Sequence, residues 1–176
     1  MILKLTEELK EVIGQFDLEG ELLECIPYGS GHINDTYRLT YKTADGQTRY
    51  ILQRMNKSIF KNPKELMENI SGVTGWLREK IQRAGGDPKR ETLNLVKDKA
   101  GNPYYVDAQG EYWRVYLFIE GATSFDQVEN DEDFYQSAVA FGHFQRLLAD
   151  YPADTLHETI VNFHNTVDRM RLFKEA

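Results

Sequence analysis

The stretch Gly29-Ser30-Gly31-His32-Ile33-Asn34 decides the fold because of the residues on either side of it. Residues 22–28 before it form an apolar run, and residues 35–41 after it alternate between polar and apolar. A dinucleotide-binding glycine loop would open a helix, whereas alternation with period two predicts a strand. We therefore expect a hairpin tip between antiparallel strands. Two interpretations remain open, an ordinary glycine turn and a loop whose uncovered N–H groups hold phosphate.

The pattern around this loop predicts the first half of a sheet. Strands are expected over residues 21–28, 35–42 and 48–55, and Asp45-Gly46 closes the second hairpin because that pair accepts positive φ. Upstream, Thr6 is a suitable cap for a short helix that packs on the sheet. Its expected apolar face consists of Leu5, Leu9, Val12, Ile13 and Phe16.

A long helix is predicted to begin at Asn62-Pro63-Lys64-Glu65, where Asn62 can cap, Pro63 suits the first helical position and Glu65 completes a capping box. Its apolar stripe comprises Leu66, Ile70, Val73, Leu77 and Ile81. Strands follow over residues 93–96, 103–107 and 112–119. The last is apolar or aromatic on both faces, so we expect it to be central. Within it, Arg114 is expected to pair with a carboxylate such as Asp107 or Glu111.

Residues 120–126 interrupt this pattern and are the expected boundary between a domain over 1–119 and a helical part over 127–176. Helices are expected over 131–150 and 167–174, the second capped by Asn165 or Thr166. Several large apolar side chains of these helices are expected to lie exposed, namely Phe134, Phe141, Phe144, Leu148 and Phe173. Exposed apolar patches favour association, so we expect the chain to form a homodimer or otherwise self-associate.

Composition excludes several classes of function. The net charge of −7 over 176 residues argues against nucleic acid or an anionic membrane surface as a partner. A single cysteine, Cys25, excludes an internal disulfide and fits a cytosolic setting. The sequence holds no apolar run of the length that a membrane-spanning helix needs.

Four stretches of the sequence carry a resemblance to a known family. They are Gly29-Ser30-Gly31-His32-Ile33-Asn34-Asp35-Thr36-Tyr37, Tyr50-Ile51-Leu52-Gln53-Arg54-Met55-Asn56 with Phe60-Lys61-Asn62-Pro63, Ala140-Phe141-Gly142-His143-Phe144-Gln145, and Asn162-Phe163-His164-Asn165-Thr166. Through them the chain resembles the aminoglycoside phosphotransferase and choline kinase superfamily, and most closely its N-acetylhexosamine 1-kinase branch. The resemblance implies an α+β, protein-kinase-like small lobe, with an antiparallel sheet of five to six strands and a long helix, followed by the first helices of a large lobe.

The resemblance also implies where ATP would bind. The implied nucleotide-binding residues are Gly29, Ser30, Gly31, His32 and Asn34 over the phosphates, Gln53, Arg54 and Asn69 beside them, and Phe118, Ile119 and Glu120 in a hinge that pairs with adenine through its backbone. Kinase-like enzymes offer a lysine from the third strand, and Gln53 stands at that position here. Either Gln53 holds phosphate as a neutral donor, or a bulge turns Arg54 to the same face. Asn69 is the implied helix partner of this region, as are Glu65 and Glu68.

The implied activity is that of a cytoplasmic kinase that uses ATP and Mg²⁺ to phosphorylate a hexosamine at the anomeric hydroxyl, with His32, Asn162 and His164 near the sugar. A choline, homoserine or aminoglycoside kinase, or a non-catalytic nucleotide-binding or interaction module, are the alternatives. The family's His-x-Asp loop and later acidic metal motif do not occur in this sequence. We therefore expect an N-terminal fragment that contains no catalytic or metal-binding residue and has no useful kinase activity by itself.

Overall fold

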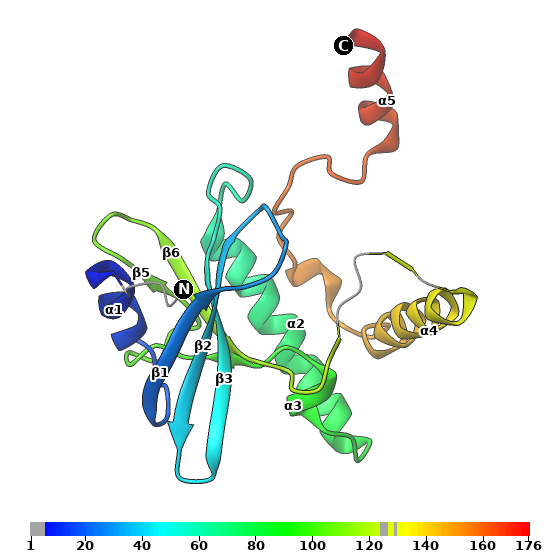
Figure 1. Ribbon diagram of the computed structural model, residues 1–176. Helices are drawn as coiled ribbons and strands as arrows, with labels where there is room; N and C mark the ends of the chain where they lie inside the picture. Colours follow the sequence, from blue (N-terminus) through cyan, green and yellow to red (C-terminus); the bar gives the residue numbers. More distant parts are fainter. Residues whose placement is uncertain (1–5, 124–126, 129) are drawn as a thin grey trace.

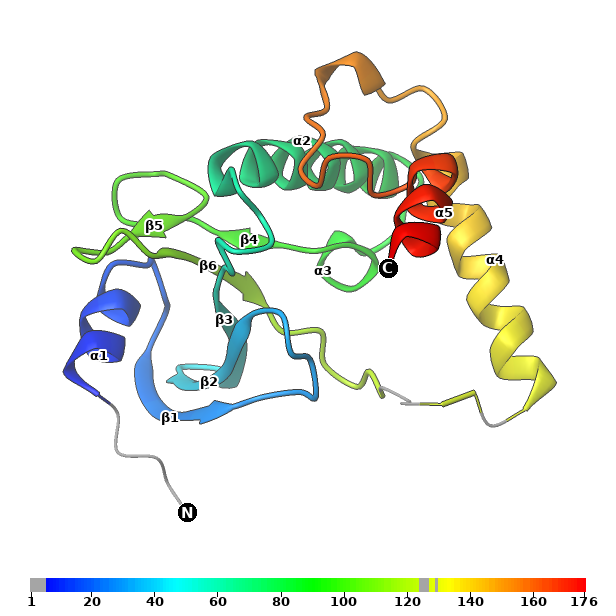
Figure 2. The same ribbon diagram turned by 90° about the horizontal axis from the view of Figure 1, so that it is seen from above.

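The computed structural model describes residues 6–123, 127–128 and 130–176, and within them six strands form one antiparallel sheet. The strands are β1 (Glu21–Pro27), β2 (Asp35–Thr43), β3 (Gly46–Arg54), β4 (Leu95–Val96), β5 (Tyr105–Val106) and β6 (Tyr112–Leu117). Their order is β1-β2-β3-β6-β4, and β5 pairs separately with β6 (Figures 1 and 2). The expected α+β class and the interior position of the last strand are therefore confirmed.

The strands form where the sequence pattern predicts them, and no strand end differs from its predicted position by more than two residues. The hairpin between β2 and β3 turns at Asp45-Gly46, where Gly46 has φ +128°, a backbone conformation that glycine adopts without strain. β3 runs in continuous register with β2 on one side and β6 on the other. β3 is thus a rigid central strand that fixes which side chains share a face.

Three of the helices begin at the predicted caps, and the short helix after Asp87 was not predicted. The helices are α1 (Glu7–Gly14), α2 (Pro63–Arg83), α3 (Pro88–Glu91), α4 (Asp131–Leu147) and α5 (Thr166–Glu175), with a 3-10 turn at Ala153–Thr155. Thr6, Asn62 and Asn165 each accept a hydrogen bond from the backbone N–H three residues later, at 3.2, 3.4 and 3.1 Å. α4 ends at Leu147, before the expected residue 150. None of the helices in the described ranges is long and apolar enough to cross a membrane.

One face of the sheet, here called the apolar face, packs against α1. Its core cluster consists of Leu9, Val12, Ile13, Phe16, Cys25, Leu39, Tyr41, Tyr50, Leu52, Trp113 and Val115. Leu39, Leu52 and Val115 are fully buried. The predicted apolar stripe of α1 is confirmed except for Leu5, which lies outside the described residues.

The opposite face, here called the polar face, carries a different set of side chains. Register aligns Thr36 of β2, Gln53 of β3 and Arg114 of β6 in one row across the three strands. α2 covers the β6 end of this row through the buried Met67, whose Sδ lies 4.0 Å from Arg114 Nη1. Alternation along each strand places these polar side chains opposite the core, because successive residues point to opposite faces.

The C-terminal helices are much less buried than the sheet. Figures 1 and 2 both show α4 to one side of the sheet, on the side away from α1. The C-terminal end of α4 contacts α2 through polar groups. Trp76 Nε1 donates to Leu147 O at 3.3 Å, and Lys80 pairs with Asp150. Phe134, Phe141, Phe144 and Phe173 are exposed, as predicted, whereas Leu148 is half-buried.

Candidate functional site

The glycine loop between β1 and β2 has open space beside both of its glycines. Gly29 has φ +83°, and a Cβ placed on Gly29 or Gly31 would meet no atom within 4 Å. The loop is tied down at its end, where Asn34 Oδ1 accepts a hydrogen bond of 3.0 Å from the N–H of Asn56. Asn34 therefore fixes the loop to the connection between β3 and α2, and the exposed glycines remain accessible to a ligand.

Beneath the loop, the aligned row on the polar face is a continuous hydrogen-bond chain. Arg114 donates to Gln53 Oε1 through Nε at 3.0 Å and through Nη2 at 2.8 Å. Gln53 Nε2 in turn donates to Thr36 Oγ1 at 3.0 Å, and that hydroxyl donates to the carbonyl of Asn34 at 3.4 Å. The chain links the centre of the sheet to the end of the glycine loop.

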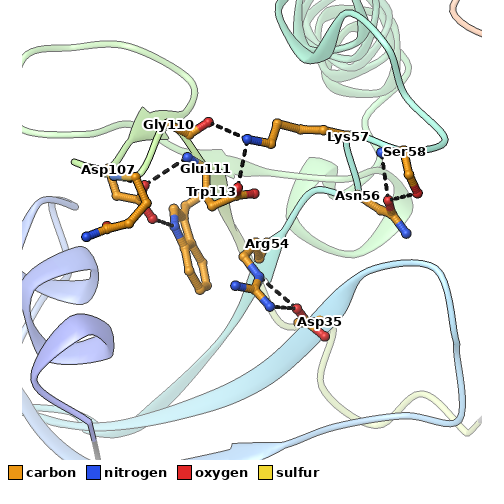
Figure 3. Close-up of polar contacts among 10 residues, drawn as sticks. Asp35, Arg54, Asn56, Lys57, Ser58, Asp107, Gly110, Glu111 and Trp113 are labelled. Carbon is orange, nitrogen blue, oxygen red and sulfur yellow. Dashed lines mark hydrogen bonds and ion pairs between the residues drawn. The ribbon is translucent and has the colours of Figure 1, made fainter.

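Among the described residues Arg114 pairs with no carboxylate, so the expected ion pair with Asp107 or Glu111 is wrong. Asp107 accepts a hydrogen bond of 2.6 Å from Trp113 Nε1, and Glu111 pairs with Lys57 at 2.7 Å (Figure 3). The reason is the alternation of β6, which directs Trp113 toward the apolar face and Arg114 toward the other. Burial lowers the pKa of the half-buried Arg114 guanidinium, because it disfavours the charged form.

Arg54 lies on the opposite face of β3 from Gln53, and the proposed bulge that would bring it round is absent. β3 keeps its register with β2 and β6 through Arg54 itself. The side chain lies 5.8 Å from the centre of the Trp113 ring and donates through Nε to Asp35 at 2.7 Å (Figure 3). The hydrogen bond to Asp35 raises the pKa of Arg54 and compensates its charge.

A polar pocket of about 440 Å³ lies beside these residues at the tip of the glycine loop. It is lined by His32, Ile33, Asp35, Arg54, Met55, Asn56, Lys57, Ser58 and Glu111. The ion pairs Arg54–Asp35 and Lys57–Glu111 are both part of its wall. His32, the predicted substrate contact, therefore lies beside the side chains of Asp35 and Arg54, away from the Gln53 row.

The predicted hinge follows β6, and some of its backbone groups already form hydrogen bonds within the chain. The N–H of Phe118 donates to Arg49 O at 3.0 Å, and the carbonyl of Glu120 accepts from Arg90 Nη1. The carboxylate of Glu120 is held by Arg49, and this hydrogen bond lowers the pKa of Glu120. Within the described ranges the backbone N–H and carbonyl of Ile119 have no hydrogen-bond partner. Ile119 thus offers both a backbone donor and a backbone acceptor that could pair with a ligand.

A second pocket, of about 480 Å³, adjoins the hinge on the polar face. It is lined by Leu23, Glu24, Arg38, Thr40, Gln47, Arg49 and Glu120. Arg38 Nη2 donates to Glu24 at 3.0 Å, and the guanidinium lies 5.8 Å from the centre of the Tyr28 ring. The rings of Tyr28 and Phe118 pack nearly perpendicular to each other, with their centres 5.6 Å apart. This aromatic pair joins the start of the glycine loop to the hinge.

The remaining predicted residues lie elsewhere. Asn69 donates to the carbonyl of His157 at 2.8 Å and accepts from its N–H at 2.9 Å, so the expected contact with Gln53 or Arg54 is wrong. At about 100° per residue, a helix that directs Met67 toward Arg114 turns Asn69 away. His157 also pairs with Glu68 at 2.8 Å.

The two predicted residues before α5 have only local contacts in the structure. The N–H of Asn162 donates to Glu158 at 2.9 Å, and Asn162 adopts φ +58°, which asparagine tolerates. The His164 ring meets the Phe163 ring at 4.9 Å. The contacts of Asn162 and His164 thus stay within their own segment, and the structure does not join them to the glycine loop.

Sequence reasoning missed Arg114, Arg38 and Thr36 as members of the site. The signal was present, since β2 places polar residues at alternate positions and β6 carries a cation among apolar neighbours. A scan of the sequence against models of known protein families finds no match. In the ranges that the structure describes, no group of three or more His, Cys, Asp or Glu could hold a metal ion.

Proposed function

We propose that this chain binds ATP on the polar face, as the kinase-like small lobe of a small-molecule phosphotransferase. The adenine would lie at the hinge and the phosphates under the glycine loop. The proposal goes beyond the α+β architecture, and it rests on the resemblance of the glycine-loop and strand-three sequences, and of residues 140–145 and 162–166, to the aminoglycoside phosphotransferase and choline kinase superfamily. The order of elements supports it, since the glycine loop joins β1 to β2, the long α2 follows β3, and the hinge follows β6.

The observation that carries the proposal is the continuity of the polar face from hinge to loop. Arg49 at the hinge pocket and Gln53 beneath the loop lie on the same face of β3. At about 3.3 Å per residue they are about 13 Å apart, which suits a nucleoside with its phosphate chain. Ile119 offers an unpaired backbone donor and acceptor at one end of this span, and the uncovered glycines offer N–H groups at the other.

The residues present fit parts of a bound nucleotide. ATP would supply the transferable γ-phosphoryl group, and this chain would orient it. Gln53 holds Arg114 and Thr36 in place through its amide, so it acts as a positioning group within the row.

The proposed acceptor is a hexosamine, phosphorylated at the anomeric hydroxyl, and this part rests on the resemblance to N-acetylhexosamine 1-kinases. Choline, homoserine and aminoglycosides are the alternative acceptors. A non-catalytic nucleotide-binding or interaction module is the alternative from another class. Turnover of ATP with N-acetylhexosamine by this chain would contradict the expectation that it has no useful kinase activity by itself.

Isothermal titration of the chain with ADP and with a non-hydrolysable ATP analogue tests the proposal. We expect saturable binding at micromolar to millimolar concentration, weakened in Gly29→Val, since a β-branched residue is strained at positive φ. Gly14→Val, at an open position on α1, is the matched control and should leave affinity unchanged. Absence of binding to the unaltered chain at millimolar nucleotide would overturn the proposal.

A further inference from the structure

We propose that Arg114 of β6, rather than a residue of β3, supplies the cation that binds the nucleotide phosphates. This inference rests on the proposed function and names the group that gives the site its selectivity for phosphate. The family resemblance assigns the phosphate-binding position to the third strand, at Gln53. Arg114 lies on a different strand, so the resemblance gives it no role. Its ligand class is a nucleoside di- or triphosphate.

The first support is the lack of charge compensation. The side-chain partners of Arg114 in the described part of the chain are the neutral Gln53 amide and the thioether of Met67. A half-buried cation with neutral partners is costly, and an anionic ligand that approaches it recovers part of that cost. A guanidinium also carries more N–H donors than these contacts use, so donors remain for phosphate oxygens.

The second support is the state of the other sheet arginines. Arg38 pairs with Glu24, Arg49 with Glu120 and Arg54 with Asp35. Each therefore already has a carboxylate partner, and Arg54 lies on the opposite face. Among the described strands, Arg114 is the arginine whose charge is left for a ligand.

The third support is position. Arg114 stands directly across from Gln53, which occupies the place where kinase-like sheets offer lysine. The hydrogen-bond chain through Gln53 and Thr36 ends at the carbonyl of Asn34 in the glycine loop. A phosphate bound between the loop and Arg114 would thus lie against groups already held in register. Arginine binds such oxygens in a fork, where lysine offers a point charge.

The test compares ATP, ADP and adenosine by isothermal titration on the unaltered chain, Arg114→Gln, Arg114→Lys and the control Arg83→Gln. Arg83 is an exposed α2 residue paired with Glu79, and its replacement by glutamine removes the same charge as Arg114→Gln. We expect Arg114→Gln to bind ATP and ADP about 10- to 100-fold more weakly and adenosine as tightly as before, and Arg114→Lys to recover part of the loss. Arg83→Gln should match the unaltered chain.

The outcomes separate this inference from the proposed function. If the unaltered chain binds none of the three ligands, the proposed function fails. If it binds ATP and Arg114→Gln binds ATP equally well, the proposed function stands and the role of Arg114 is overturned. If Arg114→Gln does not fold, the unaltered chain still decides, because ATP that binds no more tightly than adenosine would show that no cation serves the phosphates.

Discussion

The two faces of the sheet are built from the same strands and serve different ends. The apolar face buries Leu39, Leu52, Trp113 and Val115 in one cluster with α1, and the removal of these side chains from water stabilises the fold. The polar face holds Thr36, Gln53 and Arg114 in a hydrogen-bonded row beneath the glycine loop. Alternation along the strand makes this possible, since neighbours such as Trp113 and Arg114 are separated by the thickness of the sheet. Burial on the apolar face thus stabilises a sheet whose other face carries an energetically unfavourable half-buried cation.

Burial has the same electrostatic effect on both faces. On the apolar face it raises the pKa of the Cys25 thiol to about 11 and that of Tyr41 to about 12. On the polar face it lowers the pKa of Arg114. In each case the neutral form is favoured. The difference is that a thiol and a phenol remain neutral at physiological pH, whereas an arginine stays charged and so remains a site for anions.

The largest expected effect comes from breaking the apolar face. Trp113→Ala should lower the free energy of unfolding by about 3–5 kcal/mol, since it leaves a cavity and removes the hydrogen bond to Asp107. Urea denaturation followed by circular dichroism measures it. Leu23→Ala, at an exposed position on β1, is the control and should change stability by less than about 0.5 kcal/mol. Equal losses in both variants would contradict the burial of Trp113 in the core cluster.

Alkaline pH should weaken the same face more gradually. The thiol of Cys25 has a raised pKa in the folded chain, so its contribution is complete below pH 9.0 and is lost as pH rises toward 11. The loss is roughly 2 kcal/mol by pH 11. Urea denaturation at pH 8, 9.5 and 11 should show a shallower decline in Cys25→Ala than in the unaltered chain. Identical slopes would show that Cys25 ionises freely in the folded state.

A smaller effect on stability distinguishes the polar face. Arg114→Met should change the free energy of unfolding by within about 1 kcal/mol, because relief of a buried cation offsets the lost hydrogen bonds to Gln53. Its affinity for ADP should nevertheless fall at least about tenfold.

Arg54→Gln removes the same charge from the other face and is the matched comparison for Arg114→Met. It should also cost less than about 1 kcal/mol, since the ion pair with Asp35 is exposed. Its affinity for ADP should stay unchanged in the same calorimetric titration. Weaker ADP binding in Arg54→Gln than in Arg114→Met would reverse the assignment of the two faces.

The smallest expected effect is on self-association through the C-terminal helices. Unlike the sheet, these helices leave most of their large apolar side chains exposed. Phe134 and Phe141 on α4 are 69% and 70% exposed. We expect weak self-association, seen as a sedimentation coefficient that rises with concentration, and its reduction in Phe134→Ser/Phe141→Ser. Val161→Ser, at an exposed position outside the helices, should leave it unchanged. A monomer at all concentrations would contradict the expectation.

Sequence periodicity predicted the sheet and helices well because their signals are local. The hairpin at Asp45-Gly46 and the caps at Thr6, Asn62 and Asn165 each depend on a few neighbouring residues. The site was predicted less well, because its contacts join residues far apart in the chain. Arg114 and Gln53 are brought together by strand register, and Asn69 is drawn to His157 by the path of the C-terminal segment.

By itself the sequence determined the elements, the glycine hairpin and the α+β class, since period-two and helical patterns and turn residues act within a few positions. Only the tertiary structure decided which charges are paired and which face each occupies. Arg54 and Arg114 look alike in sequence, yet Asp35 neutralises one and a neutral amide holds the other. The physical reason is that pairing depends on register between distant strands, and register is fixed when the whole apolar face packs at once.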